Sequence, residues 1–93
     1  MANDKANSIL IHELDDVATA LVELQAGDVG RYKKGGEAMQ IVVTEKIPKF
    51  HKFALRDIRR TELVRKYGET IGEAMQDIGK GRHVHEHNIA SPK

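Results

Sequence analysis

The fold is decided by a stretch that reads Gly35-Gly36-Glu37-Ala38-Met39-Gln40-Ile41-Val42-Val43-Thr44-Glu45-Lys46-Ile47-Pro48. The paired glycines are a turn signal, and the apolar, branched residues that follow predict a strand over 38–44. Pro48 then interrupts the chain. A short strand between two turn signals is typical of small β domains.

Similar short runs lie on both sides of this strand. Branched aliphatic residues predict a strand at 8–12, and glycines close or interrupt two further elements at 63–68 and 70–75. Residues 15–27 fit either a helix, with an aspartate N-cap and Gly27 after its end, or a strand buried on both faces. Propensity favours the helix there, and the sequence shows no internal repeat. The whole pattern predicts a compact, mainly β domain with little helix.

Length and composition narrow the class of protein. A chain of 93 residues forms one domain and buries about 60% of its unfolded surface, so a partner or a homo-oligomer would help it. Its formal net charge of +1 argues against a nucleic-acid partner. No apolar run is long enough for a membrane span and no signal-peptide core is present, which leads us to expect a soluble, cytoplasmic protein without a membrane partner.

Three of the five histidines lie close to the C-terminus at two-residue spacing, at His83, His85 and His87. In a strand these imidazoles would share one face, and neighbours about 6.5–7 Å apart could hold one metal ion. The first and third would be about 13 Å apart, too far to share the ion unless the chain bends. A polar tail that chelates by accident is the alternative.

Two other histidines have neighbours suited to chemistry. His12 precedes an acidic pair, and a carboxylate favours imidazolium and can fix a tautomer. His51 stands beside Lys52, a pair that suits an anionic oxygen. Both histidines could equally be exposed surface residues. Basic residues are concentrated between Lys46 and Lys66, which fits either an acidic ligand or a solvated surface.

Ordered together, these pieces resemble a known family. They are His12-x-x-Asp15-Asp16-Val17-Ala18-x-Ala20-Leu21, Ile47-Pro48-x-x-His51-Lys52-x-Ala54-Leu55-x-Asp57-Ile58, Val64-x-Lys66-Tyr67-Gly68-x-x-Ile71-Gly72-x-Ala74 and Asp77-Ile78-x-x-Gly81-x-His83-Val84-His85-x-His87-Asn88. The set is similar to the small SAF domain of the altronate dehydratase family, to which galactarate dehydratase and the sulfolactate sulfo-lyase alpha subunit are related. The resemblance implies a β-clip fold over 8–89, with tails at 1–7 and 90–93, and an extended 16–22, which we follow against the helix propensity.

The resemblance also implies a function. Such a domain is joined to, or pairs with, a large catalytic part that dehydrates a sugar acid to a 2-keto-3-deoxy acid with Fe(II) or Mn(II). We expect a small subunit that is inactive without its large partner. Residues within the matching motifs are then assigned as catalytic (His12, His51 and Lys52), substrate-binding (Asp15, Lys66, Tyr67 and Asn88) and metal-binding (His83, His85 and His87).

Two departures from the family pattern bear on the site. The glycine that usually precedes the loop histidine is Phe50 here, and a second usual glycine is Thr61. Glycine permits a positive φ, and phenylalanine is expected to crowd the His51 loop. Two other functions stay open, the alpha subunit of (2R)-sulfolactate sulfo-lyase and a stand-alone module that binds metal or a sugar acid.

Overall fold

The computed structural model describes residues 5–90, which form nine short strands and no helix. The strands are β1 (Ser8–Ile9), β2 (Val17–Ala20), β3 (Val29–Lys34), β4 (Glu37–Val42), β5 (Lys52–Ala54), β6 (Leu63–Lys66), β7 (Glu69–Ala74), β8 (His83–Val84) and β9 (Ile89–Ala90). All pairs are antiparallel. The prediction of a mainly β domain with little helix is confirmed.

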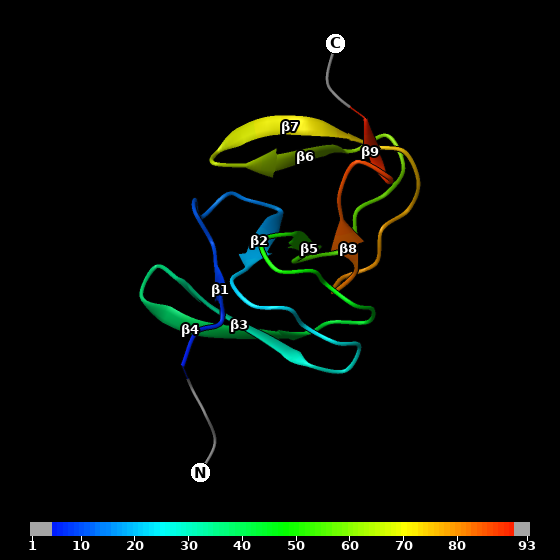
Figure 1. The fold of residues 1–93 in the computed structure, drawn as a ribbon. Helices are drawn as coiled ribbons and strands as arrows, with labels where there is room; N and C mark the ends of the chain where they lie inside the picture. The colour runs from blue at the N-terminus through cyan, green and yellow to red at the C-terminus, as the bar shows by residue number, and fades with distance from the viewer. Residues whose placement is uncertain (1–4, 91–93) are drawn as a thin grey trace.

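The strands make three small sheets stacked along the molecule. A central sheet of order β1-β2-β5-β8 lies between the β3–β4 hairpin and the sheet β6-β7-β9 (Figure 1). Each face of the central sheet therefore needs an apolar covering. Strand β5 illustrates this, because Phe53 packs in the cluster toward β3–β4 and the next residue, Ala54, packs in the cluster toward β6–β7.

The helix that propensity favours at 15–27 does not form, and β2 confirms the extended conformation expected for residues 16–22. This strand pairs with β1 on one edge and β5 on the other. Val17 and Ala18, on opposite faces, are each 1% exposed. A strand buried on both faces reads as a continuous apolar run, which is the pattern that periodicity cannot separate from a helix.

Both hairpins turn through two residues with positive φ, as type I′ turns require. Gly35 and Gly36 connect β3 to β4 with φ of 56° and 82°, as their turn signal predicted. Tyr67 and Gly68 connect β6 to β7 with φ of 58° and 75°. Tyr67 thus occupies a conformation that glycine or asparagine usually takes.

The backbone repeats itself although the sequence does not. Four β-turns, at 25–28, 48–51, 59–62 and 79–82, each carry a hydrogen bond from the fourth amide to the first carbonyl. The third residue of each has a positive φ, as in a type II turn: Gly27 (93°), Phe50 (68°), Thr61 (75°) and Gly81 (88°). The bridges Leu24↔Ile47 and Ile58↔Ile78 occupy matching places in the two halves.

The ends of the described chain join these sheets. Asn7 donates its backbone N–H to Arg31 O, and its side-chain Oδ1 accepts the backbone N–H of Arg31. Residue 7 is therefore bonded to β3, although the tail was predicted to extend to residue 7. Ala90 belongs to β9 rather than to the expected tail. Residues 1–4 and 91–93 of those tails lie outside the described residues.

Candidate functional site

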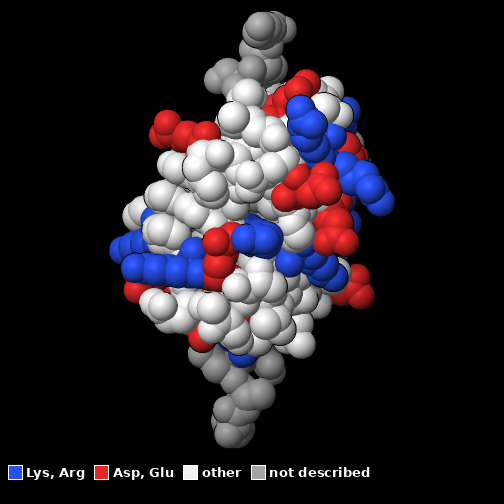
Figure 2. Space-filling model, turned by 90° about the vertical axis from the view of Figure 1, so that its right-hand side faces the viewer, with Lys and Arg blue, Asp and Glu red and all other residues white. Residues whose placement is uncertain are grey.

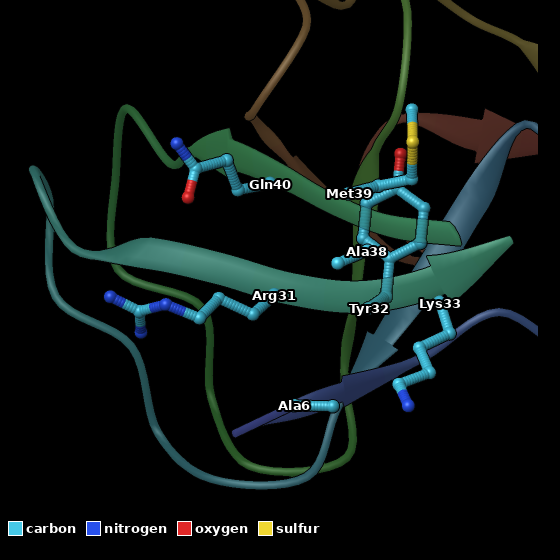
Figure 3. A pocket seen from close by; sticks show the side chains of 7 residues that line it. All are labelled: Ala6, Arg31, Tyr32, Lys33, Ala38, Met39 and Gln40. Atoms are coloured by element: carbon cyan, nitrogen blue, oxygen red, sulfur yellow. The ribbon is translucent and has the colours of Figure 1, made fainter. Parts of the chain in front are cut away.

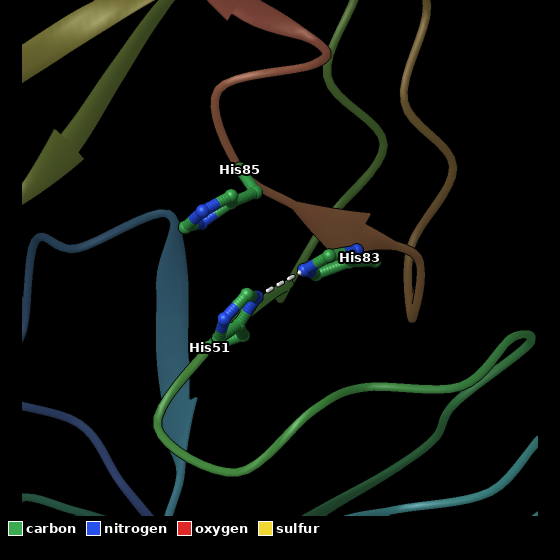
Figure 4. A group of neighbouring side chains, drawn as sticks. All are labelled: His51, His83 and His85. Atoms are coloured by element: carbon green, nitrogen blue, oxygen red, sulfur yellow. Dashed lines mark hydrogen bonds between the residues drawn. The ribbon is translucent and has the colours of Figure 1, made fainter.

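Three imidazoles meet at the edge of the central sheet. His51 directly precedes β5 and His83 opens β8, and the pairing of these strands brings the two rings together. His51 Nδ1 lies 2.8 Å from His83 Nε2, so one nitrogen donates and the other accepts. The His85 ring stacks on that of His51 with centroids 4.1 Å apart (Figure 4). We call His51, His83 and His85 the histidine cluster.

The cluster forms because the chain bends after Val84. Asn88 is 2% exposed, accepts His85 N at 2.9 Å and donates from Nδ2 to His83 O at 2.7 Å. This amide closes a turn and ends β8. The chain therefore bends within the histidine row, as sharing one ion required, because the buried asparagine supplies hydrogen bonds that a strand partner would otherwise make.

The bend changes which histidines are neighbours. His87 is exposed, and its ring lies with its centroid 5.0 Å from that of His83. His51, from a distant part of the sequence, takes the third place in the cluster. Glu45, which the sequence did not single out, accepts His83 N at 3.1 Å and helps to fix the strand end.

The environment keeps two cluster histidines neutral. Burial, followed by the like charges of His51, His87 and His85, lowers the pKa of His83 from 6.5 to about 4, although Glu45 opposes the shift. Burial and then His51 also lower the pKa of His85. A neutral imidazole has a free lone pair at neutral pH, which is the form that binds a metal.

The cluster fits a divalent metal ion. One nitrogen from each ring lies within 4.8 Å of the others. Nitrogens around a tetrahedral zinc ion are about 3.3 Å apart, so a small rotation of the rings would close the set. Among the described residues, His85 Nδ1 is a buried side-chain nitrogen without a hydrogen-bond partner, and a metal would satisfy it. Three imidazoles suit Fe(II) or Zn(II) better than Mn(II), which prefers oxygen ligands.

A pocket of about 400 Å³ opens beside the cluster. It is lined by Lys52, Ile71, His85, Glu86, Ile89 and Ala90. Burial, and then the nearby charge of Lys66, lowers the pKa of Lys52, while Glu86 opposes the shift. Lys52, predicted to be catalytic, thus brings a half-buried ammonium next to His85. Lys66 Nζ also lies over the Tyr67 ring, 4.8 Å from its centroid.

Asp15 serves a turn rather than the pocket. Its buried carboxylate accepts backbone N–H groups from His12 (3.1 Å), Tyr67 (3.0 Å) and Gly68 (2.8 Å). These bonds hold the strained β6–β7 turn. The prediction that Asp15 binds substrate remains a prediction, but its oxygens already have partners.

His12 packs on that same turn. A Cβ added to Gly68 would lie 3.0 Å from the His12 ring, so the absence of a side chain at Gly68 leaves room for this ring. Leu14 N donates to His12 Nδ1 at 3.0 Å, and a neutral ring therefore carries its hydrogen on Nε2. His12 is exposed, and that N–H can face a ligand.

Phe50 keeps the backbone conformation expected of the glycine it replaces. Its φ is 68°, and its side chain is 64% exposed with Lys49 Nζ 4.9 Å from the ring centroid. The expected crowding of the His51 loop does not occur, because the ring points away from the core.

A second pocket lies on the β3–β4 hairpin and has a different character. Tyr32 and Met39 are cross-strand neighbours there, and their side chains meet above the strands (Figure 3). Burial raises the pKa of Tyr32. This pocket brings no histidine and no carboxylate to its walls, which leaves the histidine cluster as the stronger functional site.

The surface carries no segregated charge on the face seen in Figure 2, where acidic and basic side chains are interspersed. Arg56 illustrates the mixing, since its Nε lies 2.9 Å from Asp16 Oδ1 and its Nη1 lies 3.4 Å from Glu62 Oε2. The solvated-surface reading suits this part of the basic stretch. Over residues 5–90 no helix has the length and apolar character needed to cross a membrane.

Comparison with known proteins agrees with this architecture. Residues 6–92 match the model of the altronate/galactarate dehydratase SAF domain. Altronate dehydratase of Escherichia coli (strain K12) is 41% identical over 80 residues, which are 86% of this chain and 15% of that protein. Galactarate dehydratase (L-threo-forming) of the same organism is 34% identical over 87 residues, covering 91% of this chain and 15% of the relative.

A relative of similar size also exists. The alpha subunit of (2R)-sulfolactate sulfo-lyase from Chromohalobacter salexigens is 34% identical over 89 residues, which are 90% of this chain and 94% of the subunit. The chain thus spans 15% of the length of the two dehydratases and nearly all of a lyase subunit. With its sequence motifs, its all-strand fold and these matches in agreement, the chain belongs to the altronate/galactarate dehydratase SAF-domain family.

Proposed function

We propose that this chain is the small SAF component of a sugar-acid dehydratase of the altronate type, completed by a larger catalytic polypeptide. The observation that carries the proposal is the meeting of His51, His83 and His85 next to the half-buried Lys52. The 41% identity to altronate dehydratase supports the choice of substrate. The 15% coverage of that protein supports the need for a larger partner.

Dehydration of a sugar acid removes the proton next to the carboxylate and expels the β-hydroxyl. Negative charge grows on the carboxylate side as the enediolate forms, and a cation fixed there stabilises it. Lys52 can hold the carboxylate from its place in the pocket wall. His12, with its hydrogen on Nε2, can donate a hydrogen bond to the departing hydroxyl.

The histidine cluster would hold the divalent metal that the family implies. When bound, such an ion supplies electrophilic stabilisation of the acid's oxygens. His51 would then act as a metal ligand rather than in the catalytic role that the resemblance implied. Asn88 would act through the cluster, because it positions His83 and His85 by bonding both backbones.

The test is to co-express the chain with a candidate large polypeptide of the dehydratase type from the same organism and to assay altronate, galactarate and sulfolactate. We expect the pair, and neither component alone, to convert altronate to the 2-keto-3-deoxy acid. Lys52→Met should abolish most of that turnover, whereas Lys49→Met, an exposed lysine on the Phe50 ring, should preserve it. A large polypeptide that is fully active without this chain would contradict the proposal.

A second function has its own support. The sulfo-lyase alpha subunit is matched over 94% of its length, so a separate small subunit has a precedent in this family. Both reactions would expel a substituent β to a carboxylate, and the same Lys52 pocket would serve either. Release of sulfite from sulfolactate by the reconstituted pair, with altronate left intact, would favour this alternative.

A further inference from the structure

The charges around the histidine cluster oppose a bare metal ion. Imidazole ligands bring no negative charge, so a divalent ion held by His51, His83 and His85 would keep both of its charges. Lys52 stands in the adjoining pocket wall, and the charge of Lys66 is close enough to act on it. Like charges in a half-buried site repel, which weakens metal binding.

The nearby carboxylates offer little compensation. Glu45 Oε2 is already engaged by the backbone N–H of His83 at 3.1 Å and by Arg82 Nε at 3.3 Å. Glu86 lies 3.6 Å from His85 Nε2, but its side chain is 91% exposed and therefore well hydrated. Within residues 5–90, the site thus has a cation next to three nitrogen ligands and no buried anion placed between them.

The adjoining pocket has room for the missing anion. Its walls join His85 and Lys52 to the apolar Ile71 and Ile89, and its volume is about 400 Å³. Three protein nitrogens also leave open positions on a four- to six-coordinate ion. An oxygen ligand entering from this side would meet the ion and the Lys52 ammonium together.

We propose that this chain, without a partner, binds a divalent ion through His51, His83 and His85 cooperatively with a small 2-hydroxycarboxylate that bridges the ion and Lys52. The choice of a hydroxy acid rests on the proposed function, whereas the binding needs only residues of this chain. Because coupling between two ligands is reciprocal, each should tighten the other. The sign of the Lys52 effect is the distinctive consequence: Lys52 weakens the metal alone and is required for the coupling.

The experiment titrates the purified chain with Co²⁺ and Zn²⁺, by visible absorption and calorimetry, with and without tartronate. Acetate at equal ionic strength is the control anion, and the affinity of tartronate for free metal enters the fit. We expect tartronate to tighten Co²⁺ binding by at least about fivefold, within the usual range of ligand coupling. Acetate should leave it unchanged.

Variants separate the roles. Lys52→Met should tighten Co²⁺ alone by about three- to tenfold, the effect of removing one like charge near a hydrated site, and should abolish the tartronate effect. Lys49→Met should change neither value. His51→Ala and His85→Ala should each weaken Co²⁺ by about 100-fold or more, because each removes a direct ligand. His87→Ala should change it less than about threefold, since its ring adjoins that of His83 outside the three-nitrogen set.

Several outcomes would overturn the inference. These are no Co²⁺ or Zn²⁺ binding by the folded chain, equal weakening by His87→Ala and His51→Ala, weaker Co²⁺ binding in Lys52→Met, or full tartronate coupling without Lys52. A circular dichroism spectrum for each variant excludes unfolding. If binding fails while the reconstituted pair still dehydrates altronate, this inference falls and the proposed function stands. If the chain binds Co²⁺ and tartronate cooperatively but the pair does not dehydrate altronate, this inference stands and the proposed function falls.

Discussion

The two halves of the chain, 17–51 and 52–84, follow matching backbone courses. They differ in which residue types stand at the positive-φ positions of their turns. Each half contains two turns with a positive φ at the third residue, and each half uses glycine once. Gly27 in the first half corresponds to Thr61 in the second, and Phe50 corresponds to Gly81. The shared hydrogen bonds determine the backbone, and the surroundings of each turn determine how much a side chain there disturbs it.

The largest expected effect is a difference in the stability lost when Gly81 and Gly27 are each replaced by alanine. A Cβ at Gly81 would lie 2.5 Å from Val42 O, whereas a Cβ at Gly27 would meet nothing within 4 Å. Gly81→Ala therefore adds a backbone clash to the strain of a positive φ, and we expect a loss of about 3 kcal/mol or more. Gly27→Ala should lose only about 1 kcal/mol, from the strain alone. Urea denaturation of both variants measures the difference, and equal losses would refute the clash.

The two hairpin turns offer the next comparison. Gly35-Gly36 adopts its positive φ angles without strain, but Tyr67-Gly68 depends on the Asp15 carboxylate. Asp15→Ala leaves those amides without their charged acceptor, and we expect it to destabilise the fold by about 2–3 kcal/mol. Tyr67→Gly in the same background should recover part of this loss by removing the strain. No recovery in the double variant would show that Asp15 does not support the turn conformation.

The histidine cluster, which joins the two halves, makes the stability of the fold depend on pH. The pKa of His83 is lowered from 6.5 to about 4 by folding, so below pH 6.5 the unfolded chain binds a proton that the folded chain does not. Stability should therefore fall between pH 6.5 and about 4 and level off below. We expect a loss of about 1–2 kcal/mol, less than full linkage because the ring is partly hydrated.

The measurement is thermal denaturation across this pH range with a chelator present. In His83→Gln the slope should shrink, because the main depressed group is gone; His85, whose pKa is lowered in the same direction, leaves a smaller slope. A stability that rises as the pH falls through this window would contradict the assigned environment.

The smallest effects concern the two non-glycine turn residues. Phe50→Gly and Thr61→Gly should each stabilise the chain by about 0.5–1 kcal/mol, because relief of the strained φ exceeds the entropy that glycine adds to the unfolded chain. Thr61→Gly should gain more, since a β-branched residue fits a positive φ poorly. Differential scanning calorimetry resolves the two, and destabilisation by Phe50→Gly would show that its exposed ring makes a stabilising contact.

Much of the fold was accessible from local signals. Gly35-Gly36 correctly marked the turn before β4, since turn chemistry acts over a few residues, whereas the strand predicted over 38–44 ends at Val42. Strand β2 was ambiguous on periodicity because both of its faces are buried. The repeated backbone was hidden, because Gly27, Phe50, Thr61 and Gly81 share a conformation and not a residue type.

The site was accessible only in part. The histidine row was visible, but its bend depends on the buried Asn88, whose amide could have been read as a turn former. His51 lies 32 positions before its partner His83, so spacing along the chain could not pair them. The pocket beside Lys52 likewise requires β9 to lie against β7, a contact that no local pattern encodes.

The order of the central sheet also governs how the protein folds. Both hairpins pair residues that are close in sequence, but the central sheet pairs Val17 with Ala54 and Phe53 with His83. Loop-closure entropy delays such distant pairings, so we expect the hairpins to form first and the central sheet to close last. A chain still being synthesised cannot assemble the histidine cluster until His85 has left the ribosome, so the site forms later than both hairpins.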